Sequence, residues 1–156
     1  MRIFAALLAG LALLHPATAS AELTWTLTKK EGRAYLQGFS GVEDADVEFW
    51  LQCRTDKAID VGAGGHTNVG EGKGEAVALT LLSDGKTAKL SGTSQQTRNF
   101  QNTAGVELRA KISRDDPLFA VLATGNPIKV TGSIKPVTWP VKGLKAKAAA
   151  FLQACR

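Results

Sequence analysis

Cysteine and histidine are both scarce, with two of each in 156 residues. A structural zinc site needs such ligands at characteristic spacings, and none of these spacings occurs in the chain. The sequence therefore predicts no metal site and no cofactor. A serine–histidine–aspartate hydrolase would have to use His66, because His15 lies in an N-terminal segment that we expect to be removed.

Long apolar runs are also missing. The longest, residues 3–14, follows a basic residue and falls short of the roughly 20 residues that a membrane helix requires. An Ala-Ser-Ala sequence at 19–21 then provides a cleavage site, which completes the layout of a secretory signal peptide. We therefore predict that residues 1–21 are cleaved off after Ala21. Residues 22–156 would form one periplasmic or secreted domain without an integral membrane segment.

The two cysteines have one obvious use in an oxidising compartment, which is a disulfide bond. Cys53 falls on the apolar side of an alternating pattern over 47–54, and Cys155 falls on the apolar stripe of a helical pattern. Both thiols would then point towards the core. We predict a Cys53–Cys155 bridge that ties the C-terminal helix to the sheet, and a loop of this length is worth about 4–5 kcal/mol in the chain-entropy model.

Period-two alternation of apolar and polar residues dominates the middle of the chain and indicates half-buried strands. An Asp84-Gly85 turn predicts a hairpin, and Pro136 and Pro140 confine the last strand to a sheet edge. The fold class is therefore mainly β, a single-domain β-sandwich or open barrel of about eight strands. The candidate strands are 23–28, 33–39, 47–54, 58–62, 75–82, one within 83–92, 106–112, 128–134 and 137–141.

Two segments have helical character instead. A short helix near 116–124 would start at an Asp115 or Asp116 cap with Pro117 in its first position and stop at Gly125. A C-terminal helix near 143–155 carries an apolar stripe at helical spacing, made of Leu144, Ala148, Phe151, Leu152 and Cys155.

Acidic residues are absent from the last quarter, since all 14 acids precede Pro117. The bases there include Lys142, Lys145 and Lys147, which could attract an anionic envelope component or an acidic protein. A solvated helix face is the alternative. Nucleic acid is not expected, because the compartment is wrong and aromatic and basic residues do not interleave. Trp139 would either be exposed for binding beside lysines or lie in the core or at the interface with the terminal helix.

Six glycines lie between residues 62 and 74. A phosphate-binding loop would need Ser or Thr after Gly72-Lys73, where the chain has Gly74, and a helix where a strand is predicted. Nucleotide binding is therefore not expected. The segment is either a loop between strands or a recognition loop that carries His66 and Lys73.

Carboxylates cluster over 43–48, at Glu43, Asp44, Asp46 and Glu48. The spacing of a calcium loop is absent, so a polar turn before the next strand is the simpler interpretation. A carboxylate-pair hydrolase would need two such groups facing a cleft.

The C-terminal segments 116–130 and 139–156 resemble the ending of small proteobacterial periplasmic proteins, namely the invasion-associated locus B family and accessory proteins of type VI secretion. The matching positions are Gly143, Leu144, Phe151, Leu152 and Cys155, with Cys53 as the bridging partner. The resemblance implies a non-enzymatic, virulence-associated envelope protein and carries no functional site.

These observations together predict an exported accessory protein that binds another protein or an anionic envelope component and is not an enzyme. The candidate binding residues are His66, Lys73, Trp139, Lys142, Lys145 and Lys147. An inhibitor of an envelope-directed hydrolase and a small hydrolase using His66 are the alternatives.

Overall fold

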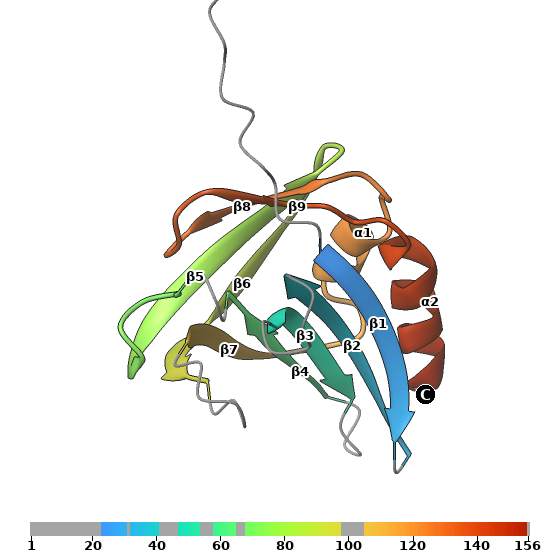
Figure 1. Ribbon diagram of the computed structural model, residues 1–156, viewed down its shortest axis with the longest axis horizontal. Helices are drawn as coiled ribbons and strands as arrows, with labels where there is room; N and C mark the ends of the chain where they lie inside the picture. The colour runs from blue at the N-terminus through green and yellow to red at the C-terminus, as the bar shows by residue number, and fades with distance from the viewer. Residues whose placement is uncertain are drawn as a thin grey trace, which may run out of the picture.

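The structure is a computed structural model that describes residues 23–30, 32–40, 47–53, 58–64, 68–97 and 105–155. The strands within these residues are β1 (Leu23–Lys30), β2 (Arg33–Ser40), β3 (Val47–Cys53), β4 (Ile59–Ala63), β5 (Lys73–Ser83), β6 (Lys86–Gln96), β7 (Val106–Ile112), β8 (Ile128–Gly132) and β9 (Val137–Trp139). They form one antiparallel sheet in the order β1-β2-β3-β4-β7-β6-β5-β8-β9, which curls into a nearly closed barrel (Figure 1). The mainly β prediction is confirmed, in its barrel form.

The hairpin between β5 and β6 follows from its turn residues. Asp84 and Gly85 both have positive φ, 47° and 71°. Two consecutive residues in this region match the twist of a two-residue hairpin, and Asp-Gly is a favoured pair for it. Ser83 pairs with Lys86 directly across the turn, so the predicted hairpin is confirmed.

The core fills the inside of the barrel. Alternating residues of each strand point inward, and Phe49, Leu51, Leu79 and Leu108 are fully buried. The residues between them face outward, as the period of two requires. The outer face of the sheet is therefore a separate surface, and most of its side chains are polar.

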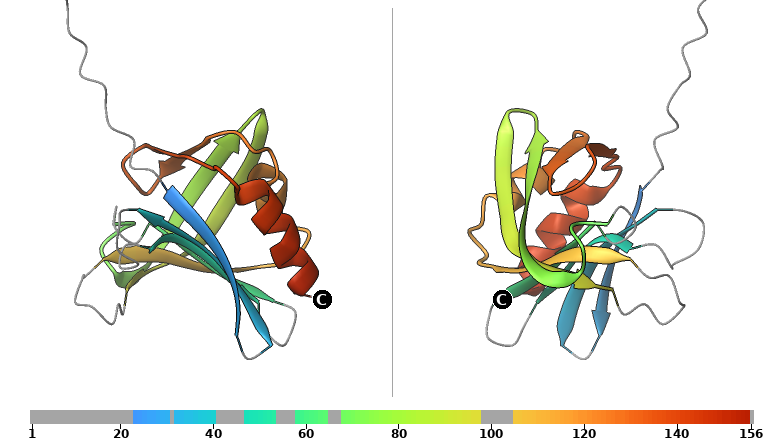
Figure 2. Two further views of the ribbon diagram at one scale, coloured as in Figure 1. Left: turned by 45° about the vertical axis from the view of Figure 1, so that its right-hand side comes forward. Right: turned by 90° about the vertical axis from the view of Figure 1, so that its left-hand side faces the viewer.

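Two helices within the described residues pack against the sheet. Helix α1 (Leu118–Leu122) packs against β5 and β6, and the Asp116 carboxylate accepts a hydrogen bond from the Leu118 amide at 2.8 Å. Helix α2 (Leu144–Ala154) lies along β1 and β2 (Figure 2). The predicted apolar stripe of α2 is confirmed, because its members are buried or half-buried.

The seam of the barrel runs between β1 and β9, the two ends of the strand order. The Trp25 indole nitrogen donates a hydrogen bond to the Pro140 carbonyl at 2.9 Å, which joins the two edges. Phe49 lies between the two seam tryptophans, with ring centroids 5.9 Å from Trp25 and 5.5 Å from Trp139. The position of β9 confirms that its flanking prolines confine it to an edge.

The predicted disulfide is confirmed: Cys53 on β3 and Cys155 after α2 are bonded, with Cα atoms 5.6 Å apart. The bridge fixes the end of α2 to the inner side of the sheet. No helix among the described residues has the length and apolarity needed to cross a membrane. The predicted signal peptide, residues 1–21, lies outside the described residues.

Candidate binding site on the outer face of the sheet

Four neighbouring strands, β3, β4, β7 and β6, bring distant residues into rows on the outer face. One row joins Trp50, Gly62, Arg109 and Thr93, each paired with the next across the sheet. A neighbouring row joins Gln52, Asp60 and Lys111 in the same way. Adjacent strands lie about 4.8 Å apart, so side chains within a row are direct neighbours.

Trp50 is half-buried because its indole lies across the next strand instead of standing out from the sheet. A Cβ atom added at Gly62 would overlap the indole ring, so this arrangement depends on the glycine. The indole nitrogen reaches beyond β4 and donates a hydrogen bond to the Glu107 carboxylate of β7 at 2.9 Å. Trp50 therefore links three strands.

Glu107 is only 3% exposed although it belongs to the outer face. Its second carboxylate oxygen accepts a hydrogen bond from Arg109 Nε at 2.7 Å and forms an ion pair with Nη2 of the same guanidinium, also at 2.7 Å. The guanidinium carbon lies 5.5 Å from the centre of the Trp50 ring, which is cation–π range. Trp50, Glu107 and Arg109, which we call the Trp50 cluster, thus hold one another in fixed orientations by charge-assisted hydrogen bonds.

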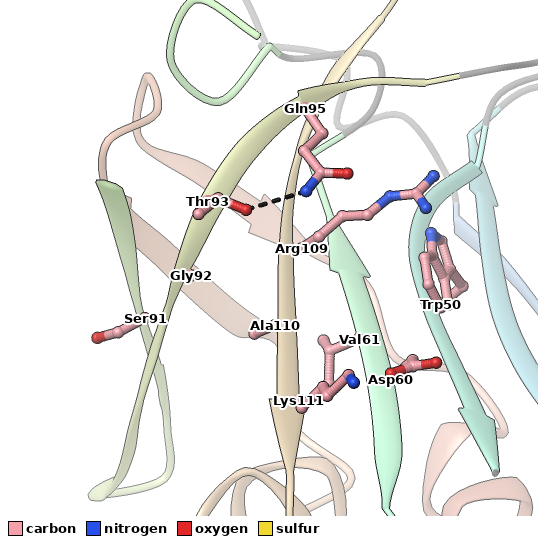
Figure 3. Close-up of a pocket in the computed structure, with 10 residues that line it drawn as sticks. All are labelled: Trp50, Asp60, Val61, Ser91, Gly92, Thr93, Gln95, Arg109, Ala110 and Lys111. Atoms are coloured by element: carbon pink, nitrogen blue, oxygen red, sulfur yellow. Dashed lines mark hydrogen bonds between the residues drawn. The ribbon is translucent and has the colours of Figure 1, made fainter. Parts of the chain in front are cut away.

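A hollow of 460 Å³ opens beside the Trp50 cluster (Figure 3). The pairing of β6 with β7 ends at Thr93 and Arg109, beyond which the two strands separate. A Cβ atom at Gly92 would collide with the Arg109 carbonyl, so the glycine lets the strands approach before they part. The hollow is lined by Trp50, Asp60, Val61, Ser91, Gly92, Thr93, Gln95, Arg109, Ala110 and Lys111.

The lining carries both hydrogen-bond donors and acceptors. The Gln95 side chain donates to the Thr93 hydroxyl at 3.1 Å, which orients its amide (Figure 3). Arg109 extends towards Trp50, while Asp60 and Lys111 occupy the other end (Figure 3). Such a surface can recognise a ligand that combines an apolar face with polar groups.

The glycine-rich segment predicted as a recognition loop is organised around one carboxylate. The Glu75 side chain accepts hydrogen bonds from the amides of Glu71 and Lys73, and the Gly72 amide donates to Ser94 Oγ at 2.8 Å. The Glu71 amide is the main reason why the pKa of Glu75 falls from 4.5 to about 2. These amides, which a phosphate would need, already have partners within the protein.

Of the predicted binding residues of this segment, the structure describes Lys73. Lys73 is exposed and its ammonium lies 2.7 Å from the Glu71 carboxylate, an exposed pair that contributes little to stability. His66 lies outside the described residues. Lys73 does not line the hollow on the outer face.

The basic residues of the C-terminal region lie on another side of the barrel. Lys142 and Lys145 are exposed and Lys147 is half-buried, all at the start of α2, which packs on β1 and β2. Trp139 is only 2% exposed, so its interpretation as an exposed binding residue is wrong. Its ring completes the core beside Phe49, as the alternative interpretation held.

The carboxylate cluster is described only at Glu48, since Glu43, Asp44 and Asp46 lie outside the described residues. Glu48 is 5% exposed and accepts a hydrogen bond from the Ser40 hydroxyl at 3.1 Å. Among the residues that the structure describes, no group of three or more His, Cys, Asp or Glu could hold a metal ion.

The Trp50 cluster was not predicted from the sequence. One signal was present, because Trp50 stands on the polar side of its strand, where an aromatic residue breaks the alternation. Its partners could not be read from this pattern, since Glu107 and Arg109 lie more than 50 positions away.

Comparison of the chain with protein-family models, with curated proteins and with solved structures found no match.

Proposed function

We propose that this chain is an exported accessory protein, periplasmic or secreted, that binds another molecule at the hollow beside Trp50 and is not an enzyme. The Trp50 cluster is the observation that carries the proposal. A buried carboxylate on the outer face of a sheet is costly unless it is paired, and here it orients an indole and a guanidinium. The cluster thus provides recognition groups whose orientation is set before a ligand arrives.

This preorganisation favours binding for an energetic reason. Each flexible side chain that a ligand must immobilise costs about 0.5–1.5 kcal/mol. The Trp50 and Arg109 side chains are already held by Glu107, so most of this cost is met during folding. The neighbouring hollow exposes part of this arranged surface to solvent.

Export is supported by two independent features. The N-terminal segment has the layout of a signal peptide, and the disulfide bond belongs to an oxidising compartment. If the proposal holds, protein recovered from the periplasm or the medium begins at Glu22 by N-terminal sequencing. Recovery of a chain that retains residues 1–21 from the cytoplasm would contradict export.

Binding through the hollow is tested by placing a photo-crosslinking amino acid at Thr93, on the rim, in cells that express the full chain. Gln153, exposed on α2, is the matched control position. We expect a discrete adduct from position 93 that is absent from position 153. Its mass and composition would tell a protein partner, such as an envelope hydrolase, from an envelope polymer. Equal or absent labelling at the two positions would contradict the proposal.

A further inference from the structure

We infer that the hollow beside Trp50 binds a neutral sugar unit of an oligosaccharide, with the indole packed against the apolar face of the sugar ring. This inference rests on the proposed binding function and assigns the chemical class of the ligand. It follows from the charge, the hydrogen-bonding groups and the aromatic ring that the fold places together.

The charges at the hollow balance. Arg109 and Lys111 are basic, Asp60 is acidic, and Glu107 lies paired beneath Arg109. A polyanion would meet the Asp60 carboxylate, and its attraction to Arg109 would be weakened by the Glu107 pair. A polycation would meet two bases. A neutral ligand encounters neither repulsion.

The polar groups suit hydroxyls, which both donate and accept hydrogen bonds. Lys111 and Arg109 only donate, and Gln95 can do both. Asp60 already interacts within the protein, and a carboxylate has further lone-pair sites that can accept. Because the Gln95 amide nitrogen already donates to Thr93, its oxygen is oriented as an acceptor. Alternating donors and acceptors around one ring match the alternating hydroxyls of a sugar.

The aromatic component is a single indole with a fixed pose. Gly62 removes the side chain that would lift the ring, and Glu107 fixes its nitrogen edge. The part of the half-buried indole that Gly62 and the Arg109 guanidinium leave uncovered offers apolar area with little loss of rotamer freedom on binding. The hollow's 460 Å³ lies in the range of small-molecule sites, about 300–1,000 Å³.

An extended peptide fits less well. A peptide added to a strand edge is held by pockets for its alternate side chains. In the lining of the hollow, Val61 is fully buried and Trp50 is the one large apolar side chain that a ligand could reach. A strand ligand would therefore have no row of apolar pockets to fill.

The test uses the folded, ¹⁵N-labelled mature chain and follows the indole N–H signals of its tryptophans by NMR. The neutral probes are maltotriose, cellotriose and chitotriose, and tri-galacturonate is the anionic comparison. We expect at least one neutral probe to shift the Trp50 signal saturably and to leave those of buried Trp25 and Trp139 in place. Asp60→Asn and Gln95→Ala should each weaken binding at least about fivefold, whereas Gln153→Ala should not change it.

The remaining outcomes distinguish failure of the sugar inference from failure of the proposed binding function. Absence of any saturable Trp50 shift with the neutral probes, or an equal response to tri-galacturonate, overturns the sugar inference. If position 93 still crosslinks specifically in cells, the proposed binding function stands without it. If neither response is seen, both are overturned. If Asp60→Asn, Gln95→Ala and the control Gln153→Ala all bind the probe with the same affinity, the sugar inference is also contradicted, because the probe would then bind outside the hollow.

Discussion

Gly62 and Trp50 show how a single missing side chain shapes the outer surface. The indole lies where the side chain of residue 62 would stand, and this brings its nitrogen to Glu107 on the second strand along. Without the glycine, the ring would have to leave the sheet and the buried carboxylate would lose a donor. The recognition surface therefore depends on a residue that makes no polar contact itself.

We predict that Gly62→Ala lowers the free energy of unfolding by about 1–3 kcal/mol, the usual cost of forcing extra volume into a packed site. The same change in a Trp50→Leu background should cost clearly less, because the clash with the indole is gone. Urea unfolding of the four chains in a double-mutant cycle measures this difference. If Gly62→Ala lowers the free energy of unfolding equally in the wild-type and Trp50→Leu backgrounds, the glycine is not needed to accommodate the indole.

Glu75 is the second residue whose role the structure defines. Its pKa is lowered to about 2, mainly by the Glu71 amide, so the folded state favours the ionised carboxylate. The stabilisation is therefore fully present above the unfolded value of 4.5 and is lost as the pH falls through about 2.

We predict that the wild type is more stable than Glu75→Gln at neutral pH and that this difference shrinks between pH 5 and pH 2. Chemical unfolding of both proteins across this interval measures it. Gln153→Ala, an exposed change on α2, is a control whose difference from the wild type should not follow the same acid titration. If the difference in free energy of unfolding between the wild type and Glu75→Gln stays constant across the interval, the ionised Glu75 carboxylate does not stabilise the fold as proposed.

At the scale of elements, most strands and both helices could be predicted from the sequence. Alternation placed β7 at its observed bounds, the Asp84-Gly85 pair placed the β5–β6 hairpin, and the prolines placed β9 at an edge. These are local signals that a chain carries within a few residues. The pairing of β4 with β7 is not local, because the β5–β6 hairpin lies between them in the chain.

The Trp50 cluster depends on that non-local pairing. For this reason the local sequence pattern indicated only Trp50, and not its partners. The sequence left two interpretations of Trp139 open for the same reason. The flanking prolines correctly indicated an edge strand, whereas the neighbouring lysines suggested an exposed ring. The core position of the ring depends on Phe49 and on the closure of the seam.

Helix α2 begins with an arrangement that does not favour its stability. Gly143, at φ 77°, provides no side-chain cap, and Lys145 and Lys147 follow where the helix dipole is positive. No acid in the first turn offsets them.

We predict that Lys145→Glu raises the free energy of unfolding by about 0.3–1 kcal/mol and that the gain decreases at high salt. Gln153→Glu, at the other end of the same helix, should have the opposite sign. Thermal or urea unfolding at low and high ionic strength measures both changes. A loss of stability in Lys145→Glu would mean that the lysine has a structural role at the helix start.

At the scale of the whole molecule, the barrel is closed by α2, the seam contacts and the disulfide rather than by strand pairing alone. The bridge joins residues separated by 102 positions, so it connects the third strand to the end of the chain. It restricts the unfolded chain strongly for that reason.

We predict that Cys53→Ser combined with Cys155→Ser lowers the free energy of unfolding by about 2–5 kcal/mol. Wild-type protein treated with a reductant should lose stability by a similar amount in urea unfolding, which controls for the serine side chains. A loss below about 1 kcal/mol would show that α2 stays docked without the bridge.

The central claim is that this molecule binds through the outer face of β3, β4, β7 and β6 and not through its basic C-terminal helix. The most direct measurement is a chemical-shift map of the ¹⁵N-labelled mature protein on addition of solubilised envelope from the cells that produce it. We expect shifts and broadening concentrated at Trp50, Thr93, Gln95 and Arg109. These changes should be lost in a Trp50→Leu variant that remains folded. Perturbation centred on Lys142, Lys145 and Lys147, unchanged in Trp50→Leu, would contradict it.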